Sequence, residues 1–276
     1  MQQLPCHTVV FTDLDGTLLN DSYDLDSAAQ ILNELRLCGV LAVPASSKTA
    51  AEMHAFKERL DYDVPLIGEN GALLSWPAHL EAQANRIPQA QPTTSYAEIC
   101  DTLAALRTTY GFKFAGFADM SLDEVATATG LDLHAASLAR QRTASEPIRW
   151  DDNPERLQAL RAQLKQQGLV LVAGGRFLHA MSPVDKGSAA RRVLEVLTAD
   201  RPQQPLVLAC GDSPNDMSML RIADGCLVFP RHSGGYLETE VEPTLKAKAP
   251  GVLCWLKGVK TLMQMLDKPL NEEATP

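Results

Sequence analysis

Short apolar runs alternate with helical patterns in the first part of the chain. Residues 9–11 and 40–43 are continuous apolar runs of strand length, and residues 26–37 between them carry apolar side chains at helical spacing. Gly39 follows that helical pattern as a typical stop. A further helical pattern at 50–60 and an apolar run at 65–67 repeat this order. Repeated strand, helix, strand predicts an α/β fold with a doubly wound, mostly parallel sheet.

The pattern changes after about residue 80 and returns near residue 185. Residues 85–94 are rich in Gln, Pro and Thr without periodicity, which predicts a linker. Beyond it we expect helices at 96–110, 122–129, 132–142 and 154–167 and strands at 112–117, 147–150, 169–173 and 177–181. The wound pattern then resumes with helices at 185–197, 214–222 and 252–266 and strands at 206–209 and 226–229. We therefore expect a core formed by 1–82 and 184–276, with a smaller α+β domain inserted at 83–183.

Two carboxylates follow the first predicted strand. Asp13 and Asp15 are two residues apart, Gly16 permits a tight turn, and Thr17 can offer a hydroxyl or N–H group to an anion. Loops that follow the strands of an open α/β sheet meet at the edge where such sheets bind ligands. There, one carboxylate can attack an electrophile while the other transfers protons, and both can hold a hard cation. An acidic surface turn is the alternative interpretation.

Later strands bring further polar residues to the same edge. Ser46 follows the second strand and can donate to an oxyanion, although Ser46 or Ser47 can instead cap the next helix. Lys186 opens a helix, where a positive charge is unfavourable for the helix dipole and is better explained by neutralisation of an anion. Asp212, in Gly211-Asp212-Ser213-Pro214-Asn215-Asp216, is a third carboxylate, and this stretch also suits a helix start.

Composition narrows the range of partners. The 276 residues include 25 basic and 34 acidic side chains, for a net charge of −9, so a nucleic-acid or anionic-membrane partner is not expected. An anionic substrate therefore needs a local basic pocket or a metal. The N-terminal residues lack the pattern of a signal peptide, and no apolar run reaches the length of a membrane span, so we expect a cytoplasmic protein.

Together, these motifs resemble those of the haloacid dehalogenase superfamily of phosphatases. The resemblance implies that Asp13 is the nucleophile and forms an aspartyl-phosphate, and that Asp15 is the general acid and base. It also implies that Ser46 and Lys186 bind the phosphoryl group. Mg²⁺ would be held by Asp13, by Asp212 and by the main-chain carbonyl of Asp15.

Two further features fit one branch of this superfamily. Asn215 and Asp216 would support the site, with Asp216 orienting Lys186. Glu69-Asn70-Gly71-Ala72, together with the inserted domain, looks like the subgroup that carries a C2-type cap, which governs substrate choice.

A narrower resemblance, to mannosyl-3-phosphoglycerate phosphatases, rests on residues 140–148, 174–179 and 229–231. It implies hydrolysis of mannosyl-3-phosphoglycerate to phosphate and mannosylglycerate, a compatible solute. Arginines can grip a carboxylate or phosphate in a bidentate manner, and Ser or Glu can hydrogen-bond sugar hydroxyls. The candidate substrate-binding residues are Lys48, Asn70, Arg142, Ser145, Glu146 and Arg176.

Several alternatives stay open at this point. A glucosyl-3-phosphoglycerate phosphatase, a broader sugar-phosphate phosphatase or a sugar phosphomutase could use the same fold. A non-catalytic relative is a further possibility, but it predicts loss of one or more of Asp13, Asp15, Lys186 and Asp212, and all four are present.

Overall fold

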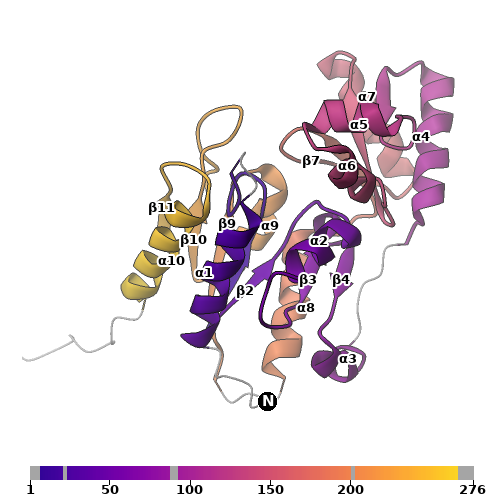
Figure 1. Ribbon diagram of the computed structural model, residues 1–276. Coiled ribbons are helices and arrows are strands. Elements are labelled where there is room, and N and C mark those ends of the chain that lie inside the picture. Colours follow the sequence, from indigo (N-terminus) through magenta and orange to yellow (C-terminus); the bar gives the residue numbers. More distant parts are fainter. Residues whose placement is uncertain (1–6, 21–23, 88–92, 200–202, 267–276) are drawn as a thin grey trace, which may run out of the picture.

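The computed structural model describes residues 7–20, 24–87, 93–199 and 203–266, and it contains two sizeable sheets (Figure 1). The larger sheet has five parallel strands in the order β11-β10-β9-β1-β2. These strands are β1 (Thr8–Thr12), β2 (Val40–Pro44), β9 (Leu206–Gly211), β10 (Gly225–Val228) and β11 (Thr244–Lys246). Every residue of β1 and β2 is buried, as expected for a parallel sheet that is covered on both faces. The predicted doubly wound α/β core is confirmed.

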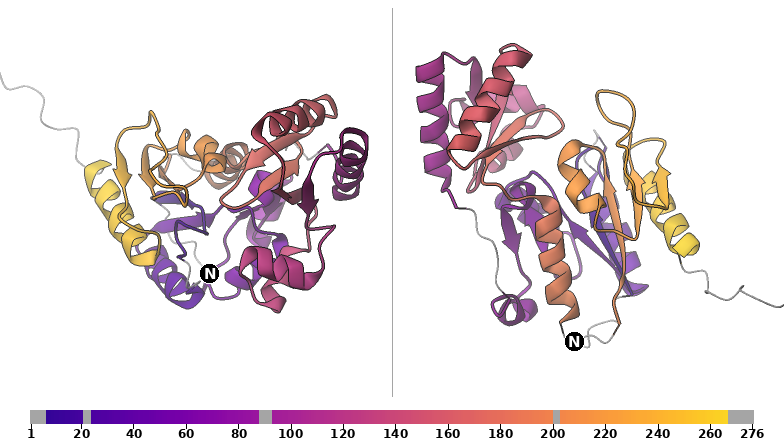
Figure 2. Two further views of the ribbon diagram at one scale, coloured as in Figure 1. Left: turned by 90° about the horizontal axis from the view of Figure 1, so that it is seen from above. Right: turned by 180° about the vertical axis from the view of Figure 1, so that it is seen from behind.

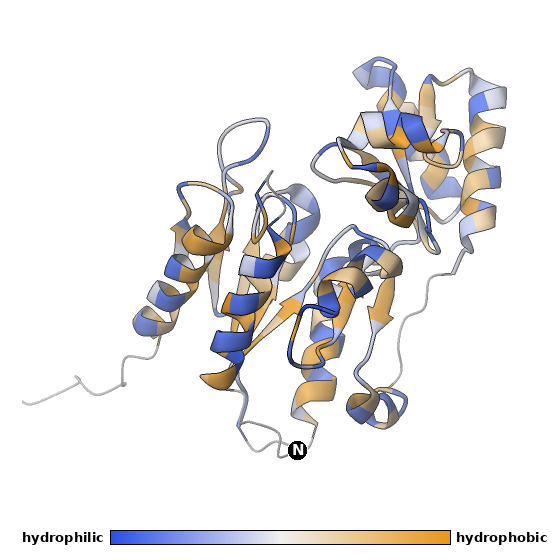
Figure 3. Cartoon of the chain, in the orientation of Figure 1, coloured by the Kyte–Doolittle hydropathy of each residue, from blue (hydrophilic) through white to orange (hydrophobic). Residues whose placement is uncertain are grey.

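Helices pack on both faces of this sheet (Figure 2). One face carries α1 (Leu25–Leu37) and α10 (Val252–Leu266), and the other carries α8 (Lys186–Thr198) and α9 (Met217–Leu220), which follows the 3₁₀ turn η2 (Pro214–Asp216). Apolar residues gather on the strands and on the helix faces turned toward them (Figure 3). The fully buried Trp255 of α10 donates its indole N–H to Thr12 Oγ1 at 2.9 Å, which ties the helix to the end of β1.

The third predicted strand does not extend the parallel sheet. β3 (Leu66–Gly68) pairs antiparallel with β4 (Leu73–Ser75), and a single bridge between Ala45 and Ile67 joins it to the end of β2. The 3₁₀ turn η1 (Glu69–Gly71) connects β3 to β4, and α3 (Ala78–Ala84) follows. The sequence pattern did not predict β4, α3 or β11, because elements of three to seven residues are too short to show a clear period.

The second sheet is antiparallel and lies between the two halves of the core sequence. Its order is β5-β6-β8-β7. Its strands are β5 (Phe114–Gly116), β6 (Ser145–Trp150), β7 (Val170–Ala173) and β8 (Leu178–Met181), and its helices are α4 (Tyr96–Tyr110), α5 (Leu122–Thr129), α6 (Leu133–Ala139) and α7 (Pro154–Gln166). It has apolar clusters of its own, so the predicted α+β insertion is present. We call α4 through β8 the insertion; the domain limits at 83 and 183 stay a prediction.

Residues 1–6 and 267–276, at the two ends of the chain, lie outside the described ranges. The same holds for residues 88–92 of the predicted linker. None of the helices within those ranges is both long and apolar enough to cross a lipid bilayer.

The start of α8 depends on close packing at Gly187. Helix propensity favours alanine over glycine by up to ~1 kcal/mol, but a Cβ on Gly187 would lie 2.2 Å from the Ser218 carbonyl oxygen. Because backbone cannot give way as a flexible side chain can, we expect Gly187→Ala to lower the free energy of unfolding by about 1–3 kcal/mol in urea denaturation. Gly175→Ala is the control, since nothing lies within 4 Å of a Cβ there. Unchanged or raised stability in Gly187→Ala would contradict this packing argument.

Candidate active site

A cavity lies where the carboxyl edge of the five-stranded sheet faces the insertion. Both parts of the fold line it, with acidic side chains mainly on the core side and arginines on the insertion side. The core side includes Asp13, Asp15, Gly16, Ser47, Lys48, Glu52, Asp212, Asn215 and His232, and the insertion side includes Phe117, Leu131, Arg142, Arg176, Phe177 and His179.

Three buried carboxylates lie close together at and beneath the cavity floor, and two of them contact a buried ammonium group. Oxygens of Asp13, Asp212 and Asp216 lie within 4.8 Å of one another. Lys186 Nζ is 2.6 Å from Asp13 Oδ1 and 2.6 Å from Asp216 Oδ1, and its side chain is fully buried. Although burial lowers it, the charges of Asp13 and Asp216 raise the pKa of Lys186 above its usual value. Lys186 is therefore charged and fixed beside Asp13.

The carboxylates outnumber the cations of this cluster. Burial raises the pKa of Asp13 well above its usual range, although Lys186 acts in the opposite direction. Burial, together with the nearby charge of Asp216, raises the pKa of Asp212 to about 7. Burial makes the charged form of each carboxylate unfavourable, and a cation close to these oxygens would stabilise it, so the cluster suits a bound divalent cation.

The oxygens of the cluster divide into two groups. Asp216 Oδ1 faces Lys186, and its Oδ2 accepts the main-chain N–H groups of Asp212 and Ser213, both at 3.0 Å. Asp216 is thus occupied by the protein itself, which leaves Asp13 and Asp212 with oxygens for a metal. These are hard ligands of the kind that Mg²⁺ prefers. Gly16 allows the close approach of the two loops, since its φ is +78° and a Cβ there would lie 3.1 Å from Asp212 Oδ2.

Asp15 lies beside the cluster and pairs with the loop after β2. Lys48 Nζ is 3.0 Å from Asp15 Oδ2 and 3.5 Å from Glu52 Oε1. Asp15 Oδ1 is buried and has no hydrogen-bond partner among the described residues. The carboxyl group therefore keeps one oxygen for a substrate or water.

Ser46 lies just below the cavity wall. Its side chain is buried, and its Oγ accepts the main-chain N–H of Lys48 at 3.3 Å. The alternative that Ser46 or Ser47 caps the following helix is wrong, because Thr49 is the N-cap of α2 (Ala50–Lys57), in a capping box with Glu52. Thr49 Oγ1 also donates to the Leu138 carbonyl of the insertion at 2.9 Å.

The insertion contributes arginines and a neutral histidine. Arg142 and Arg176 line the cavity, and Arg176 Nη1 donates to the Thr129 carbonyl. Burial, reinforced by the positive charges of Arg142 and Lys186, lowers the pKa of His179 to about 3. His179 Nδ1 is buried and has no hydrogen-bond partner among the described residues. His179 therefore lines the cavity as a neutral imidazole whose Nδ1 is available for a hydrogen bond to a ligand or water.

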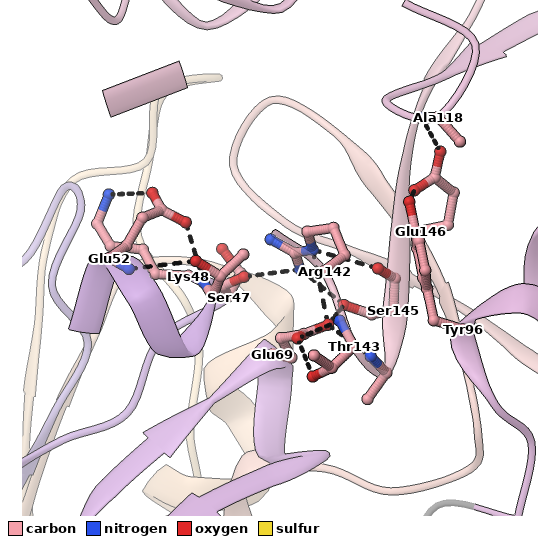
Figure 4. Close-up of polar contacts among 12 residues, drawn as sticks. Ser47, Lys48, Glu52, Glu69, Tyr96, Ala118, Arg142, Thr143, Ser145 and Glu146 are labelled. Carbon is pink, nitrogen blue, oxygen red and sulfur yellow. Dashed lines mark hydrogen bonds and ion pairs between the residues drawn. The ribbon is translucent and has the colours of Figure 1, made fainter. Parts of the chain in front are cut away.

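Three predicted substrate-binding residues do not line the cavity. The Ser145 hydroxyl contacts Arg142 Nη2 at 2.6 Å and Glu69 Oε2 at 2.8 Å, while Glu146 accepts the Tyr96 hydroxyl at 2.9 Å and the Ala118 N–H at 2.8 Å (Figure 4). Asn70 Oδ1 accepts the amide of Asn215 at 2.8 Å. These side chains are engaged within the protein, so their direct contact with substrate stays a prediction.

The sequence analysis missed several cavity residues, namely Glu52, Phe117, Phe177 and His232, and it assigned no role to Glu69. Phe117 and Phe177 form an edge-to-face pair with ring centroids 5.1 Å apart. In sequence Phe117 looks like an ordinary core aromatic, whereas Phe177 lies in the stretch 174–179 that carries the narrower resemblance, where no separate role was predicted for it.

The parallel core, the Asp–Lys cluster at its carboxyl edge and the α+β insertion above it define a hydrolase-type active site under a cap. The family model for haloacid dehalogenase-like hydrolases matches residues 10–228. The chain belongs to this family, and within it to the subgroup with a C2-type cap.

Curated relatives agree with this assignment, and a solved structure shares the fold. A glucosyl-3-phosphoglycerate/mannosyl-3-phosphoglycerate phosphatase of Persephonella marina is 31% identical over 94% of this chain and 98% of its own. A protein of the same name from Methanococcoides burtonii is 30% identical over 92% of this chain and 97% of its own. The fold resembles that of a haloalkanoate-superfamily phosphatase from Bacteroides thetaiotaomicron, with a TM-score of 0.62 at 16% identity, covering 95% of this chain and 96% of that one.

The neutral state of His179 has a measurable consequence. Between about pH 3 and pH 6.5 the unfolded chain binds a proton at this position and the folded protein does not, so stability from this group is lost as pH falls below 6.5. We expect the stability advantage of the wild type over His179→Gln to shrink by about 2 kcal/mol between pH 6.5 and pH 5. Urea denaturation at both pH values measures it. A difference that does not change with pH would show that His179 is protonated in the folded protein.

Proposed function

We propose that the protein is a Mg²⁺-dependent phosphatase that hydrolyses glucosyl-3-phosphoglycerate or mannosyl-3-phosphoglycerate through an aspartyl-phosphate. The observation that carries the proposal is the 2.6 Å contact between Lys186 Nζ and Asp13 Oδ1 at the floor of the cavity. A buried ammonium group there neutralises a phosphoryl group at the atom where a carboxylate can attack it.

In the first half of the reaction, an oxygen of Asp13 attacks the phosphorus atom of the ester. The bond between phosphorus and the ester oxygen breaks, and Asp15 in its protonated form donates the proton that the leaving oxygen needs. The product is released as an alcohol and Asp13 carries the phosphoryl group. Lys48, 3.0 Å from Asp15 Oδ2, fixes the position of the Asp15 carboxyl group.

In the second half, water attacks the phosphorus atom of the aspartyl-phosphate. Asp15, now ionised, accepts the proton of that water, and the bond between phosphorus and the Asp13 oxygen breaks to release inorganic phosphate. Both carboxyl groups thereby return to their starting states. Lys186 stays beside Asp13 throughout and offsets the charge of the transferring group.

Asp13 and Asp212 would hold Mg²⁺, together with the main-chain carbonyl of Asp15 that the family resemblance implies. When bound, the ion supplies positive charge to the phosphoryl oxygens. Ser46, in the loop after β2, would contribute to binding of the same phosphoryl group. Asp216 would hold Lys186 in place, and Asn215 would hold the loop after β9 against Asn70.

The choice of substrate rests on the relatives and on the charge of the cavity wall. Both curated relatives are named for glucosyl- and mannosyl-3-phosphoglycerate. Lys48, Arg142 and Arg176 line the cavity around the acidic floor, which fits a substrate that carries a carboxylate as well as a phosphate. The product would be glucosylglycerate or mannosylglycerate, the latter a compatible solute. A phosphatase acting broadly on sugar phosphates, or a phosphomutase, is the alternative.

The two catalytic carboxylates have separable roles. We expect Asp13→Asn to lose phosphatase activity by at least about 10⁴-fold, because an amide is a poor nucleophile. Asp15→Asn keeps the nucleophile but lacks the proton donor and acceptor, so we expect a loss of about 10²–10⁴-fold and accumulation of phosphoprotein. Phosphate release and intact-protein mass after rapid quenching measure both. Near wild-type turnover in Asp13→Asn would overturn the mechanism.

Substrate choice is tested by Mg²⁺-dependent phosphate release. We expect kcat/KM for mannosyl- or glucosyl-3-phosphoglycerate to exceed that for simple hexose phosphates by about 10²-fold or more, since only the former place a carboxylate among the arginines. Equal, weak rates on all substrates would refute the narrow assignment and favour a broad phosphatase. A requirement for a bisphosphate activator with little phosphate release would favour a mutase.

A further inference from the structure

Glu69 is a fully buried carboxylate of the core whose hydrogen bonds all reach into the insertion. Its Oε1 accepts the N–H and the hydroxyl of Thr143 at 2.9 and 2.8 Å, and its Oε2 accepts the Ala144 N–H at 3.0 Å and the Ser145 hydroxyl at 2.8 Å. Arg142 Nε lies 3.6 Å from Oε2. Figure 4 shows these donors gathered around the carboxylate. A single core side chain therefore holds the start of β6.

The same contacts fix Arg142 in the cavity wall. Arg142 Nε donates to the Ser145 carbonyl at 3.2 Å, and its Nη2 donates to the Ser145 hydroxyl and, at 3.0 Å, to the Ser47 carbonyl of the core. Glu69 therefore contacts both the guanidinium group and the residue that orients it. Because Arg142 lines the cavity that Asp13 also lines, this arrangement sets the position of the insertion relative to the nucleophile.

Glu69 is itself rigidly placed by the core. Glu69 and Asn70 have φ angles of 45° and 59°, a left-handed conformation that is rare for residues other than glycine. Asn70 contacts Asn215 of the loop after β9, and a Cβ on Gly71 would lie 2.2 Å from the Asp185 carbonyl oxygen. Residues 69–71 thus lie against both later catalytic loops.

We propose that Glu69 is a positioning residue that holds the insertion closed over the catalytic edge and presents Arg142 to the substrate. This inference rests on the proposed function for its kinetic part only. Loss of the carboxylate lowers the fraction of molecules in the closed arrangement, which raises the apparent KM for a substrate that contacts both parts of the fold. A small ester that needs only the core side is affected far less.

Glu69→Gln tests the proposal, since it keeps the size of the side chain but places an NH₂ donor against donors of residues 143–145. We expect KM for mannosyl- or glucosyl-3-phosphoglycerate to rise on the order of tenfold, with kcat/KM for p-nitrophenyl phosphate changed by less than about threefold. Thr143→Val removes one of the same hydrogen bonds and is expected to shift KM in the same direction by a smaller factor. It keeps the test valid if Glu69→Gln folds poorly.

A second measurement does not depend on substrate. Amide hydrogen exchange of the segment 142–146 is expected to accelerate on the order of tenfold in Glu69→Gln, because the NH₂ group replaces the oxygen that accepts either the Thr143 or the Ala144 N–H and repels the donors on that side. Asp152→Asn is the matched control: Asp152 accepts the Lys113 and Asn153 N–H groups and pairs with Arg156, all within the insertion. It should leave exchange at 142–146 and both kinetic constants unchanged.

The outcomes separate this inference from the proposed function. Unchanged exchange at 142–146 in Glu69→Gln, or equal losses on the large and small substrates, would overturn the positioning role. If the wild type fails to hydrolyse either phosphoglycerate ester but Glu69→Gln still accelerates exchange at 142–146, the proposed substrate is wrong and the role of Glu69 in holding the insertion stands.

Discussion

The buried ammonium group of Lys186 is the constraint on which the site depends. Removing carboxylates from water is unfavourable unless a positive charge and hydrogen bonds replace the water, and Lys186 supplies that charge to Asp13 and Asp216. The backbone accommodates this contact closely. A Cβ on Gly187 would lie 2.2 Å from Ser218, and one on Gly211 would lie 2.5 Å from Asp216. Glycine at 187 lets α8 pack closely against α9, and glycine at 211 lets Asp216 lie against the end of β9, so that Lys186 and Asp216 can meet.

Charge is distributed unequally between the two walls of the cavity. The core wall carries an excess of carboxylate, and burial, together with the charges of neighbouring aspartates, raises the pKa of Asp13 and, to about 7, that of Asp212. The insertion wall carries Arg142 and Arg176 and a histidine that stays neutral. A bound cation would compensate the first wall. On the second wall Glu69 already faces Arg142 at 3.6 Å, so an anionic ligand would compensate mainly Arg176.

The parts of the site that follow strand ends could be predicted from the sequence. Asp13, Ser46 and Asp212 come directly after apolar runs, and the ends of parallel strands meet at one edge. The sequence could not show that Ser145 and Glu146 are held inside the insertion, because their partners Glu69, Tyr96 and Ala118 are 28 to 76 residues away in sequence. The β3–β4 hairpin was also missed, since a parallel strand and a short hairpin strand have the same apolar signature over three residues.

The strained backbone at Glu69 and Asn70 lies where the core meets the insertion. A left-handed conformation costs roughly 1–2 kcal/mol per residue for side chains other than glycine, and such strain persists only where surrounding contacts fix it. Here the compensating hydrogen bonds come from Thr143, Ala144 and Ser145 on the other side of the interface. Within the core, the Glu69 N–H donates to the Lys48 carbonyl and the Asn70 N–H donates to the Ser46 carbonyl, so contacts on both sides of the interface offset the strain. In the docked arrangement the fully buried Glu69 carboxylate has hydrogen-bond donors in place of water, and these donors favour contact between the core and the insertion.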